Sequence, residues 1–348
     1  MVSGRDKKGF MNRLFDIRLI RTLTFSRVLN IIKVHASFHL SKLLKRHILW
    51  GDPYILTIEP VNCCNLSCPQ CATGSGQLNR NKAMMQRKTY EAIIDASRQS
   101  LCYLVLYNQG EPFLHKGLID FIRYAKRGNI YIITSTNGHF FENESTPEKI
   151  VSSGLDAVIV SLDGIDEETY TRYRKNGNFK KVVDGIRKLV HIRNSSGKGC
   201  PGIYIQFLVM KHNAHQMQGM KTLARELGAD RVLFKTVQVN DMDEAEKLLP
   251  DDANLHRYEI SENGFTLPKR SAPCRRLWTS STILCDGSVV PCCFDKRGQY
   301  VLGVIDKNKN INDIWLSNKY EEFRKRVIRE RGSIDICGNC TEGQKVYI

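Results

Sequence analysis

Six short apolar runs alternate with segments of helical period between residues 54 and 237. The runs are strand-like, because they are short, rich in Ile, Val, Leu and Tyr, and bounded by polar residues. They are residues 54–59, 101–107, 130–134, 156–162, 203–209 and 231–237, and helical segments occupy 88–99, 116–127, 147–153, 179–193 and 214–227. This alternation predicts a parallel sheet covered by helices. Six units are too few for a closed eight-stranded barrel, so we expect an α/β fold with an open, partial six-unit β/α barrel.

The chain beyond residue 240 follows a different pattern. Residues 241–273 form a polar connection that contains several prolines. Residues 282–291 predict a hairpin with an Asp-Gly turn, and a basic helix is expected over 312–331. A segment this small has a thin core, so a metal centre would help it to fold. We therefore expect four regions, 1–50, 51–240, 241–273 and 274–348.

Positive charge is concentrated at the N-terminus. The whole chain has a formal net charge of +16, and residues 1–50 hold 11 Lys and Arg against 2 Asp and Glu. Residues 10–32 and 38–46 mix apolar and basic side chains at helical spacing. Such a basic amphipathic helical segment can lie on an anionic membrane surface, or it can pack on the protein as a structural strap. No nucleic-acid motif accompanies the charge, so no nucleic acid is expected as a partner.

No stretch of the sequence has the properties of a membrane span or of an export signal. There is no run of 18 apolar residues, which a spanning helix would need. The first residues also lack an unbroken apolar stretch followed by a small-residue cleavage site. We therefore expect a cytoplasmic protein, with peripheral contact to the inner face of the membrane as an extension of that prediction.

Most of the 12 cysteines are clustered. A secreted disulfide protein would carry an export signal, so the clusters indicate metal or iron–sulfur ligation. Cys64, Cys68 and Cys71 form C-x3-C-x2-C at the end of the first strand-like run. Three thiolates can hold three irons of a [4Fe–4S] cluster and leave the fourth iron open to a small molecule. The alternatives are zinc, although no fourth ligand lies near this loop, and plain buried thiols.

This loop and the ends of the next three strands resemble the radical S-adenosylmethionine (SAM) superfamily. IEPVNCCNLSCPQC carries the cysteines, NQGEP follows the second strand, STNG the third and SLDG the fourth, and YTRYRKNGNF comes next. In that superfamily the open iron binds the methionine part of SAM, and the strand ends contact the rest of it. The resemblance implies SAM-contacting roles for Gln109, which replaces a family glycine, and for Gly110, Glu111, Pro112, Ser135, Asn137, Ser161, Asp163 and Arg174.

A second group of cysteines occupies the C-terminal region. Cys274, Cys292, Cys337 and Cys340 are separated by 17, 44 and 2 residues, and a Gly-x4-Cys pattern precedes the second of them. This resembles the SPASM domain in its shortened, one-cluster "twitch" form, which implies that these four hold an auxiliary [4Fe–4S] cluster. A structural four-cysteine zinc site is the alternative. Cys285 is expected to pack as a small apolar residue, and Cys293, next to Cys292, is expected to face the other way.

The resemblance implies an enzyme. A reduced cluster would cleave SAM to methionine and a 5′-deoxyadenosyl radical, which would abstract hydrogen from the substrate. A one-electron donor such as flavodoxin or ferredoxin would supply the electron. The motifs identify no catalytic acid or base.

The substrate is expected to be a small-molecule or lipid-linked carbohydrate or alcohol, which would be oxidised or epimerised. Residues 1–50 look too short and too helical for the peptide-recognition domain that peptide-modifying enzymes of this type carry. A peptide-modifying maturase is the alternative within the superfamily. An iron–sulfur or zinc-ribbon binding protein without enzymatic activity is the alternative from another class.

Overall fold

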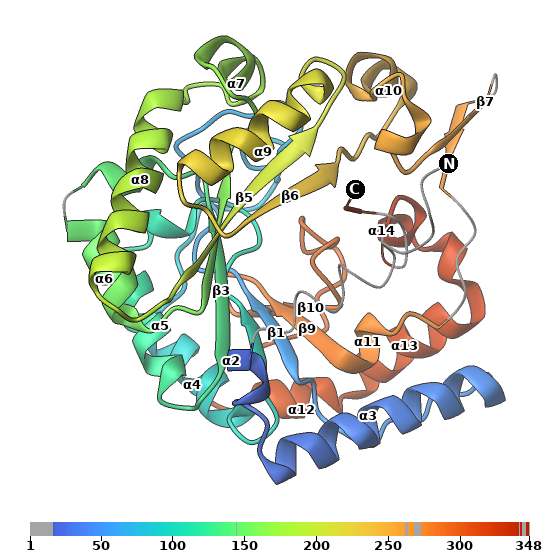
Figure 1. The fold of residues 1–348 in the computed structure, drawn as a ribbon. Helices are drawn as coiled ribbons and strands as arrows, with labels where there is room; N and C mark the ends of the chain where they lie inside the picture. The colour runs from blue at the N-terminus through green and yellow to red at the C-terminus, as the bar shows by residue number, and fades with distance from the viewer. Residues whose placement is uncertain are drawn as a thin grey trace.

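A nine-stranded sheet forms the centre of the structure, a computed structural model that describes residues 17–143, 145–261, 264–267, 273–340, 342 and 346–347. The strands lie in the order β11-β10-β9-β1-β2-β3-β4-β5-β6 (Figure 1). They are β1 (Ile55–Ile58), β2 (Tyr103–Val105), β3 (Tyr131–Thr136), β4 (Ala157–Ser161), β5 (Gly202–Val209), β6 (Arg231–Thr236), β9 (Ser280–Ile283), β10 (Ser288–Val290) and β11 (Gly303–Val304). Each of β1 to β6 is parallel to the next. Since β6 and β11 are the two edges among the described residues, the sheet is open and the predicted partial six-unit barrel is confirmed.

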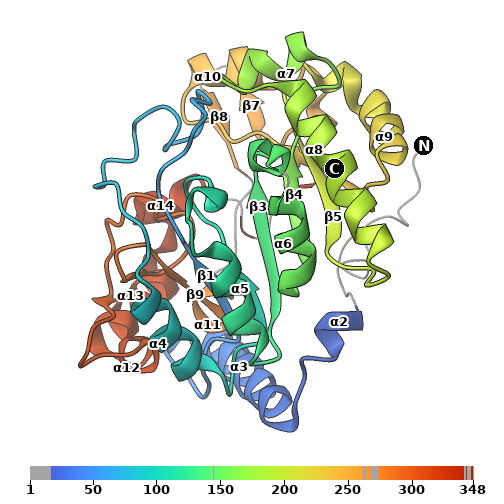
Figure 2. The ribbon, with the colours of Figure 1, turned by 90° about the vertical axis from the view of Figure 1, so that its left-hand side faces the viewer.

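Helices cover the outer face of the parallel strands, as Figures 1 and 2 show. They are α4 (Arg87–Ser97), α5 (Leu118–Lys126), α6 (Ser145–Ser153), α8 (Phe179–Ser195) and α9 (Met217–Glu226), and they correspond to the five predicted helical segments. The sequence pattern missed α7 (Glu167–Tyr173), which begins where the Asp166 side chain accepts a hydrogen bond from Thr169 N. Short 3-10 helices are η1 (Pro112–Leu114), η2 (His139–Glu142), η3 (Ala214–Gln216), η4 (Ala253–Leu255) and η5 (Arg331–Ser333).

Both faces of the parallel strands are buried. On the outer face, alternate residues such as Ile132, Val158 and Ile205 join the large core under the helices. On the inner face, Ile159 and Leu233 belong to a separate small apolar cluster inside the barrel. Parallel sheets with both faces covered have near-continuous apolar strands, which explains why the sequence pattern located these strands well.

The C-terminal region continues the same sheet. Strand β9 pairs in parallel with β1, and β9 and β10 form the predicted hairpin, in which Gly287 adopts a φ of 88°. Its helices are α11 (Arg276–Thr279), α12 (Ile311–Trp315), α13 (Asn318–Glu330) and α14 (Asp335–Gly338). The single basic helix expected over 312–331 is therefore two helices, because Ser317 caps a new one by accepting a hydrogen bond from Tyr320 N. The predicted domain boundaries stay predictions.

The N-terminal region packs on the barrel as a strap. Its helices are α2 (Ile17–Ile20) and α3 (Phe25–Leu44), where residues 10–32 and 38–46 were expected to be helical; residues 10–16 lie outside the described range. Val34 and Phe38 of α3 are buried in the main core. The Arg27 guanidinium donates to the carbonyls of Asn129 and Gly128 at 2.7 Å each, just before β3 begins. Helix α3 therefore crosses the amino ends of the strands. No helix in the described part of the chain is long and apolar enough to cross a membrane.

The expected connection over 241–273 is partly ordered. It contains α10 (Met242–Leu248) and a two-stranded hairpin of β7 (Glu259–Ser261) and β8 (Gly264–Thr266). Close to it, the C-terminal tail returns to the barrel, where Tyr347 forms a bridge with Lys235 and Thr236 N donates to Val346 O at 2.8 Å. The open β6 edge thus pairs with an extended segment of the chain's own backbone.

Candidate functional site

The loop after β1 holds the first group of cysteines at the carboxyl end of the strand, where parallel α/β folds place their ligands. The thiols of Cys64, Cys68 and Cys71 lie close enough to interact electrostatically. Burial, together with the nearby carboxyl of Glu111, raises the pKa of the Cys64 thiol to about 11. A raised pKa favours the protonated thiol. A bound metal would favour the thiolate instead, because ligation requires it. Cys63 points elsewhere, with its Sγ 3.9 Å from Asn62 Oδ1. Three facing thiols fit a cluster with one open iron.

Gly110 lets the loop after β2 pass directly beneath the cysteine loop. Its φ is 77°, and a Cβ at this position would lie 2.4 Å from Val61 O and 2.6 Å from Cys63 O. The next residue, Glu111, donates its backbone N–H to the same Cys63 carbonyl at 2.7 Å. A larger residue would push the two loops apart, so the close contact of the loops explains why NQGEP has a glycine at this position. Gln109, which stands where the family has a glycine, is buried beside Gly110.

The carboxylate of Glu111 is buried at the end of β3. It accepts hydrogen bonds from Thr136 Oγ1 at 2.8 Å, Asn137 N at 2.7 Å and Phe113 N at 3.1 Å. Burial raises its pKa to about 7, against the effect of these donors. A carboxylate offers about four acceptor positions, so one remains for a ligand amino group. Pro112, which starts η1, is also buried.

Side chains at the ends of β3 and β4 face the cysteine loop. Asn137 Nδ2 donates to Asn65 Oδ1 at 2.8 Å and lies 3.9 Å from Cys64 Sγ. The hydroxyls of Ser135 and Ser161 make no hydrogen bond with any described residue in this structure. Both hydroxyls are therefore available to a ligand at the strand ends, as the resemblance implies.

Asp163 and Arg174 form a buried ion pair beside the cysteine loop. Arg174 Nε donates to Asp163 Oδ2 at 2.5 Å, and Leu208 N donates to the other carboxylate oxygen at 2.7 Å. Arg174 Nη1 lies 3.9 Å from Cys68 Sγ. These two donors leave acceptor positions on the Asp163 carboxylate, so this residue positions Arg174 and its predicted contact with a cofactor stays a prediction. Arg174 faces the cysteine loop, where the resemblance expects it.

Glu59, which the motif analysis missed, connects the two halves of the site. Its side chain is fully buried at the end of β1. One carboxylate oxygen accepts from Arg80 Nη2 at 2.6 Å and from the backbone N of Cys285 at 3.3 Å. The other accepts from Asn108 Nδ2 at 3.1 Å and Gln109 N at 3.2 Å. A carboxylate directly after a buried apolar strand is the signal that could have identified it.

The second group of cysteines also comes together. Burial, together with the neighbouring Cys340 and Cys274, raises the pKa of the Cys337 thiol to about 11. The Cys292 thiol, whose pKa burial also raises, interacts with Cys340 as well. The four predicted ligands are thus neighbours, and they fit a four-thiolate cluster. The guanidinium of Arg331 acts in the opposite direction on Cys337 and Cys274, because a nearby cation favours their anionic forms.

The two remaining C-terminal cysteines face other groups. Cys293 Sγ lies 3.7 Å from Arg276 Nη1, and that arginine pairs with Glu342 at 2.6 Å. Cys285 is buried beside Glu59, and burial strongly raises the pKa of its thiol. Among the described residues, no three Cys, His, Asp or Glu side chains are arranged around a single point as one metal ion would require.

Between the two groups of cysteines, the barrel interior contains an uncompensated cation. Lys235 on β6 has no acidic partner within ion-pair distance among the described residues. Burial and the nearby Arg257 lower its pKa, while Cys293 and Asp163 act in the opposite direction. Tyr107 lies near the same Cys293 and the C-terminal Tyr347. Sequence analysis missed Lys235, because a single lysine in a strand has no distinguishing pattern.

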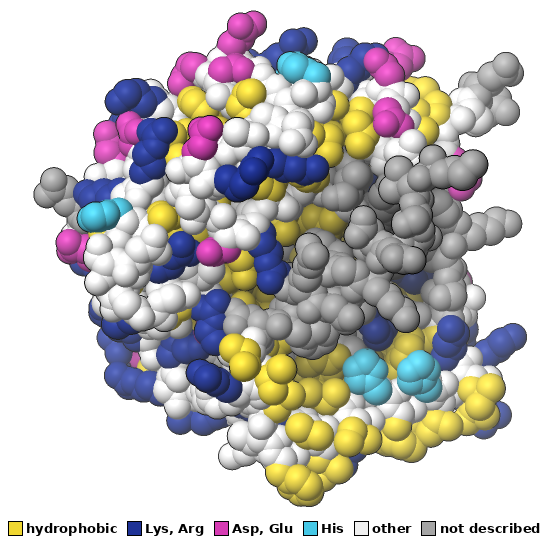
Figure 3. Space-filling model, viewed as in Figure 1, with side chains coloured by type: hydrophobic (Ala, Val, Ile, Leu, Met, Phe, Trp, Pro, Cys, Tyr) yellow, Lys and Arg dark blue, Asp and Glu magenta, His cyan; other side chains and the backbone are white. Residues whose placement is uncertain are grey.

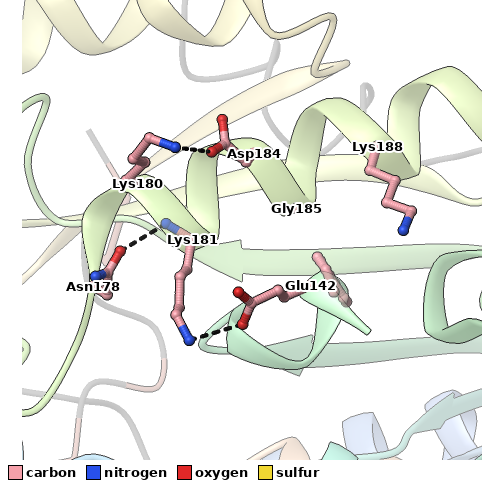
Figure 4. Close-up of a pocket in the computed structure, with 8 residues that line it drawn as sticks. Glu142, Asn178, Lys180, Lys181, Asp184, Gly185 and Lys188 are labelled. Carbon is pink, nitrogen blue, oxygen red and sulfur yellow. Dashed lines mark hydrogen bonds and ion pairs between the residues drawn. The ribbon is translucent and has the colours of Figure 1, made fainter. Parts of the chain in front are cut away.

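Two hollows on the outer surface lie away from these residues. One of about 380 Å³ lies between η2 and α8, where Lys181 pairs with Glu142 and Lys180 with Asp184 (Figure 4). Another of about 540 Å³ lies between residues 299–302 and α13. Neither is lined by a predicted cofactor ligand, so the chemistry is better placed at the strand ends.

Comparisons with known proteins agree with this geometry. The radical SAM superfamily model matches residues 58–205, and the SPASM iron–sulfur cluster-binding domain model matches residues 274–341. Mycofactocin maturase MftC of Mycobacterium tuberculosis is 23% identical over 312 residues, which cover 83% of this chain and 75% of that protein. PqqA peptide cyclase of Gluconobacter oxydans is 27% identical over 260 residues, or 70% of each protein.

Solved structures agree on the fold. Streptococcus suis SuiB bound to precursor peptide SuiA has a TM-score of 0.59 and 17% identity, and the likeness covers 89% of this chain and 75% of that one. At this level of identity the likeness shows the fold alone. The two family models, together with relatives that match most of this chain, lead to one conclusion: this chain is a radical SAM enzyme with a C-terminal SPASM domain, and it belongs to a superfamily that uses [4Fe–4S] clusters and SAM.

Proposed function

We propose that this radical SAM enzyme modifies a peptide substrate, with one cluster held by Cys64, Cys68 and Cys71 and a second held by the four C-terminal cysteines. When bound and reduced, the first cluster would supply the electron that cleaves SAM to methionine and a 5′-deoxyadenosyl radical. The observation that carries the site assignment is the hydrogen-bonded chain from Glu111 through Asn137 to the cysteine loop. It fixes the loop relative to the strand ends before any cofactor binds.

The chain's own residues would bind and orient SAM. Glu111 keeps one acceptor position for the SAM amino group, since three donors occupy the others. Arg174, held by Asp163, would face the SAM carboxylate. Ser135 and Ser161 would donate to polar groups of the nucleoside from the ends of β3 and β4. Holding the reacting atoms in one orientation lowers the entropy cost of the step.

A peptide suits the features that lie between the two groups of cysteines. The β6 edge can pair with a peptide backbone, because Thr236 N bonds to Val346 O of the chain itself, and a substrate peptide would take the place of that residue. Adding a strand to a sheet edge is a common way to bind a peptide. Beside that edge, the ammonium of Lys235 would hold a carboxylate or a carbonyl of the bound segment.

The relatives favour the same substrate class. By name, one is a maturase and another a peptide cyclase, and SuiB is described with a precursor peptide. The small-molecule or lipid-linked carbohydrate expected from the sequence is therefore the weaker choice. Its lipid-linked form relied on the N-terminal segment, yet α3 crosses the amino ends of the strands, at the opposite end from the cysteine loop.

We place the enzyme in the cytoplasm, where a one-electron donor such as flavodoxin or ferredoxin would reduce the first cluster. Anaerobic reconstitution with iron, sulfide, dithionite and SAM tests the reaction, and 5′-deoxyadenosine should accumulate. A pool of unmodified short peptides should increase that production, and mass spectrometry should find a peptide with altered mass. Stimulation by sugars or polyols but by no peptide would overturn the substrate class while leaving the enzyme class intact.

Lys235 provides a sharper test of substrate binding. With the responsive peptide, Lys235→Met should raise KM by about tenfold or more, because one charge-assisted hydrogen bond contributes about 1.5–3 kcal/mol. Lys235→Arg should recover much of the loss. Neither change should alter cleavage of SAM in the absence of peptide, and an equal loss of uncoupled cleavage in both variants would place Lys235 at the SAM site instead.

A further inference from the structure

The outer face of α2 and α3 exposes a row of apolar side chains. Phe25 is 84% exposed, Ile32 58% and Leu43 76%. Figure 3 shows the row as hydrophobic side chains along α3, at the lower edge of the molecule. Other exposed members of this face are Ile17, Ile20, Leu23, Val28, Leu29 and Leu44. Contiguous exposed apolar surface of this kind marks a site of interaction.

The same face has basic residues and no acidic ones. Residues 17–51 contain no Asp or Glu. The exposed basic residues are Arg21, Lys33, Lys42, Lys45 and Arg46. An apolar stripe flanked by Lys and Arg and without acidic residues is the arrangement that places a helix in the interface of an anionic membrane.

The apolar row is not needed to hold α3 on the barrel. The opposite face of the helix does this, through the buried Val34 and Phe38 and through the carbonyl contacts of Arg27. The segment that follows α3 is also held on the protein, since Trp278 Nε1 donates to Ile48 O at 2.8 Å. The docked face and the outer face of the helix therefore have separate roles.

We propose that the outer face of α2 and α3 binds the surface of an anionic membrane. A second copy of this chain fits less well, because a two-fold contact through one face would bring its own basic residues together. A lipid surface instead offers an apolar phase for the row and negative headgroups for the flanking cations. Each basic residue engaged near such a surface strengthens binding by about fivefold.

This contact fixes the orientation of the enzyme on the membrane. Helix α3 lies at the amino ends of the strands, and the cysteine loop lies at their carboxyl ends. Strand β5 has 8 residues, so the two ends are roughly 25 Å apart. The mouth of the barrel would face away from the lipid, and its substrate would arrive from the aqueous side.

Vesicle flotation with the full-length protein tests the contact. Vesicles of phosphatidylglycerol in phosphatidylcholine should carry the protein upward at low salt, and phosphatidylcholine alone should carry at least tenfold less. The double variant Phe25→Ser/Ile32→Ser should lose at least tenfold of the bound fraction. Ile260→Ser is the matched control, because Ile260 is 54% exposed on β7 and should have no effect.

Each outcome decides the proposal. The double variant should keep the melting temperature and the SAM cleavage of the original protein, since neither residue touches the core or the site. Equal flotation of the original protein and the double variant would overturn the proposal. No flotation of the original protein, combined with a dimer that the double variant dissociates, would assign the face to a second copy instead.

Discussion

The two groups of cysteines are held by different means. Cys64, Cys68 and Cys71 follow a buried central strand, and side chains from the ends of neighbouring strands contact their loop. Cys292 and Cys340 also lie on irregular segments, but these are beside a short hairpin at the end of the sheet. The first site is thus organised by the sheet before any cofactor is present, whereas the second must gain much of its order from ligation. The enzyme combines a preformed site and a ligand-dependent site in one continuous sheet.

Removing the first set of ligands should have the largest effect. Replacing Cys64, Cys68 and Cys71 with Ala should abolish production of 5′-deoxyadenosine and leave about half of roughly eight irons per chain. The circular dichroism spectrum should change little, because the β-strand scaffold does not depend on these thiols. Iron and sulfide assays after anaerobic reconstitution measure the first effect. Finding tightly bound zinc in place of the remaining iron would assign the second site to zinc.

Removing one ligand of the second site should have an equal effect on iron but a larger effect on the fold. Cys292→Ala should lose the other half of the iron and lower the melting temperature, since ligation and folding are linked there. Cys293→Ala is the matched control, because that thiol faces Arg276. If the control loses iron while Cys292→Ala retains it, the ligand is the neighbouring residue. An unchanged melting temperature in Cys292→Ala would contradict the proposed contrast between the sites.

Glu59 links the two sites, so its replacement tests their connection. Glu59→Gln leaves the buried guanidinium of Arg80 without its charged partner, and breaking such a pair costs about 3 kcal/mol. Chemical denaturation of the cluster-free protein should show this loss. Asp184→Asn, which breaks only exposed pairs on α8, should leave the transition unchanged. Equal stability of the two variants would mean that the buried ion pair contributes nothing.

The smallest effect is expected at the other end of the strands. The Asp156 carboxylate accepts from Ile132 N and Lys126 Nζ, each at 2.8 Å, and burial raises its pKa. Its contribution to stability is therefore fully present below the pKa of the unfolded chain, about 3.9. It is lost as the pH rises through the folded value. Asp156→Asn should reduce the pH dependence of the free energy of unfolding in this range without altering either site. An unchanged pH dependence would assign that part of the profile to other groups.

The sequence predicted the parts of the structure that depend on local patterns. Six apolar runs became β1 to β6, because strands buried on both faces are nearly continuous apolar segments. The motifs after these strands came together, because parallel strands end at one edge of the sheet. The residues that carry these motifs could therefore be named in advance as candidates.

The parts that the sequence did not predict depend on distant contacts. Glu59 accepts a hydrogen bond from the backbone of Cys285, which is 226 residues away. No local pattern reports such a pair, so neither this link nor the joining of β9 to β1 was expected. The sequence also left open where the N-terminal segment packs, because an amphipathic helix has the same sequence pattern whether its apolar face contacts a protein core or a membrane. The structure shows that opposite faces of α3 are buried and exposed.

The pairing of β1 with β9 has a consequence for a chain that is still being synthesised. The hydrogen-bonding groups on one side of β1 stay without their final partner until β9 has left the ribosome. At about 5–20 residues per second, a gap of 226 residues takes roughly 10–45 s to translate. During that interval an unpaired strand edge beside the first cysteine loop is open to aggregation or to a chaperone. Slow synthesis, low temperature or co-expressed chaperones should therefore influence the yield of this enzyme more than the stability of its finished fold would suggest.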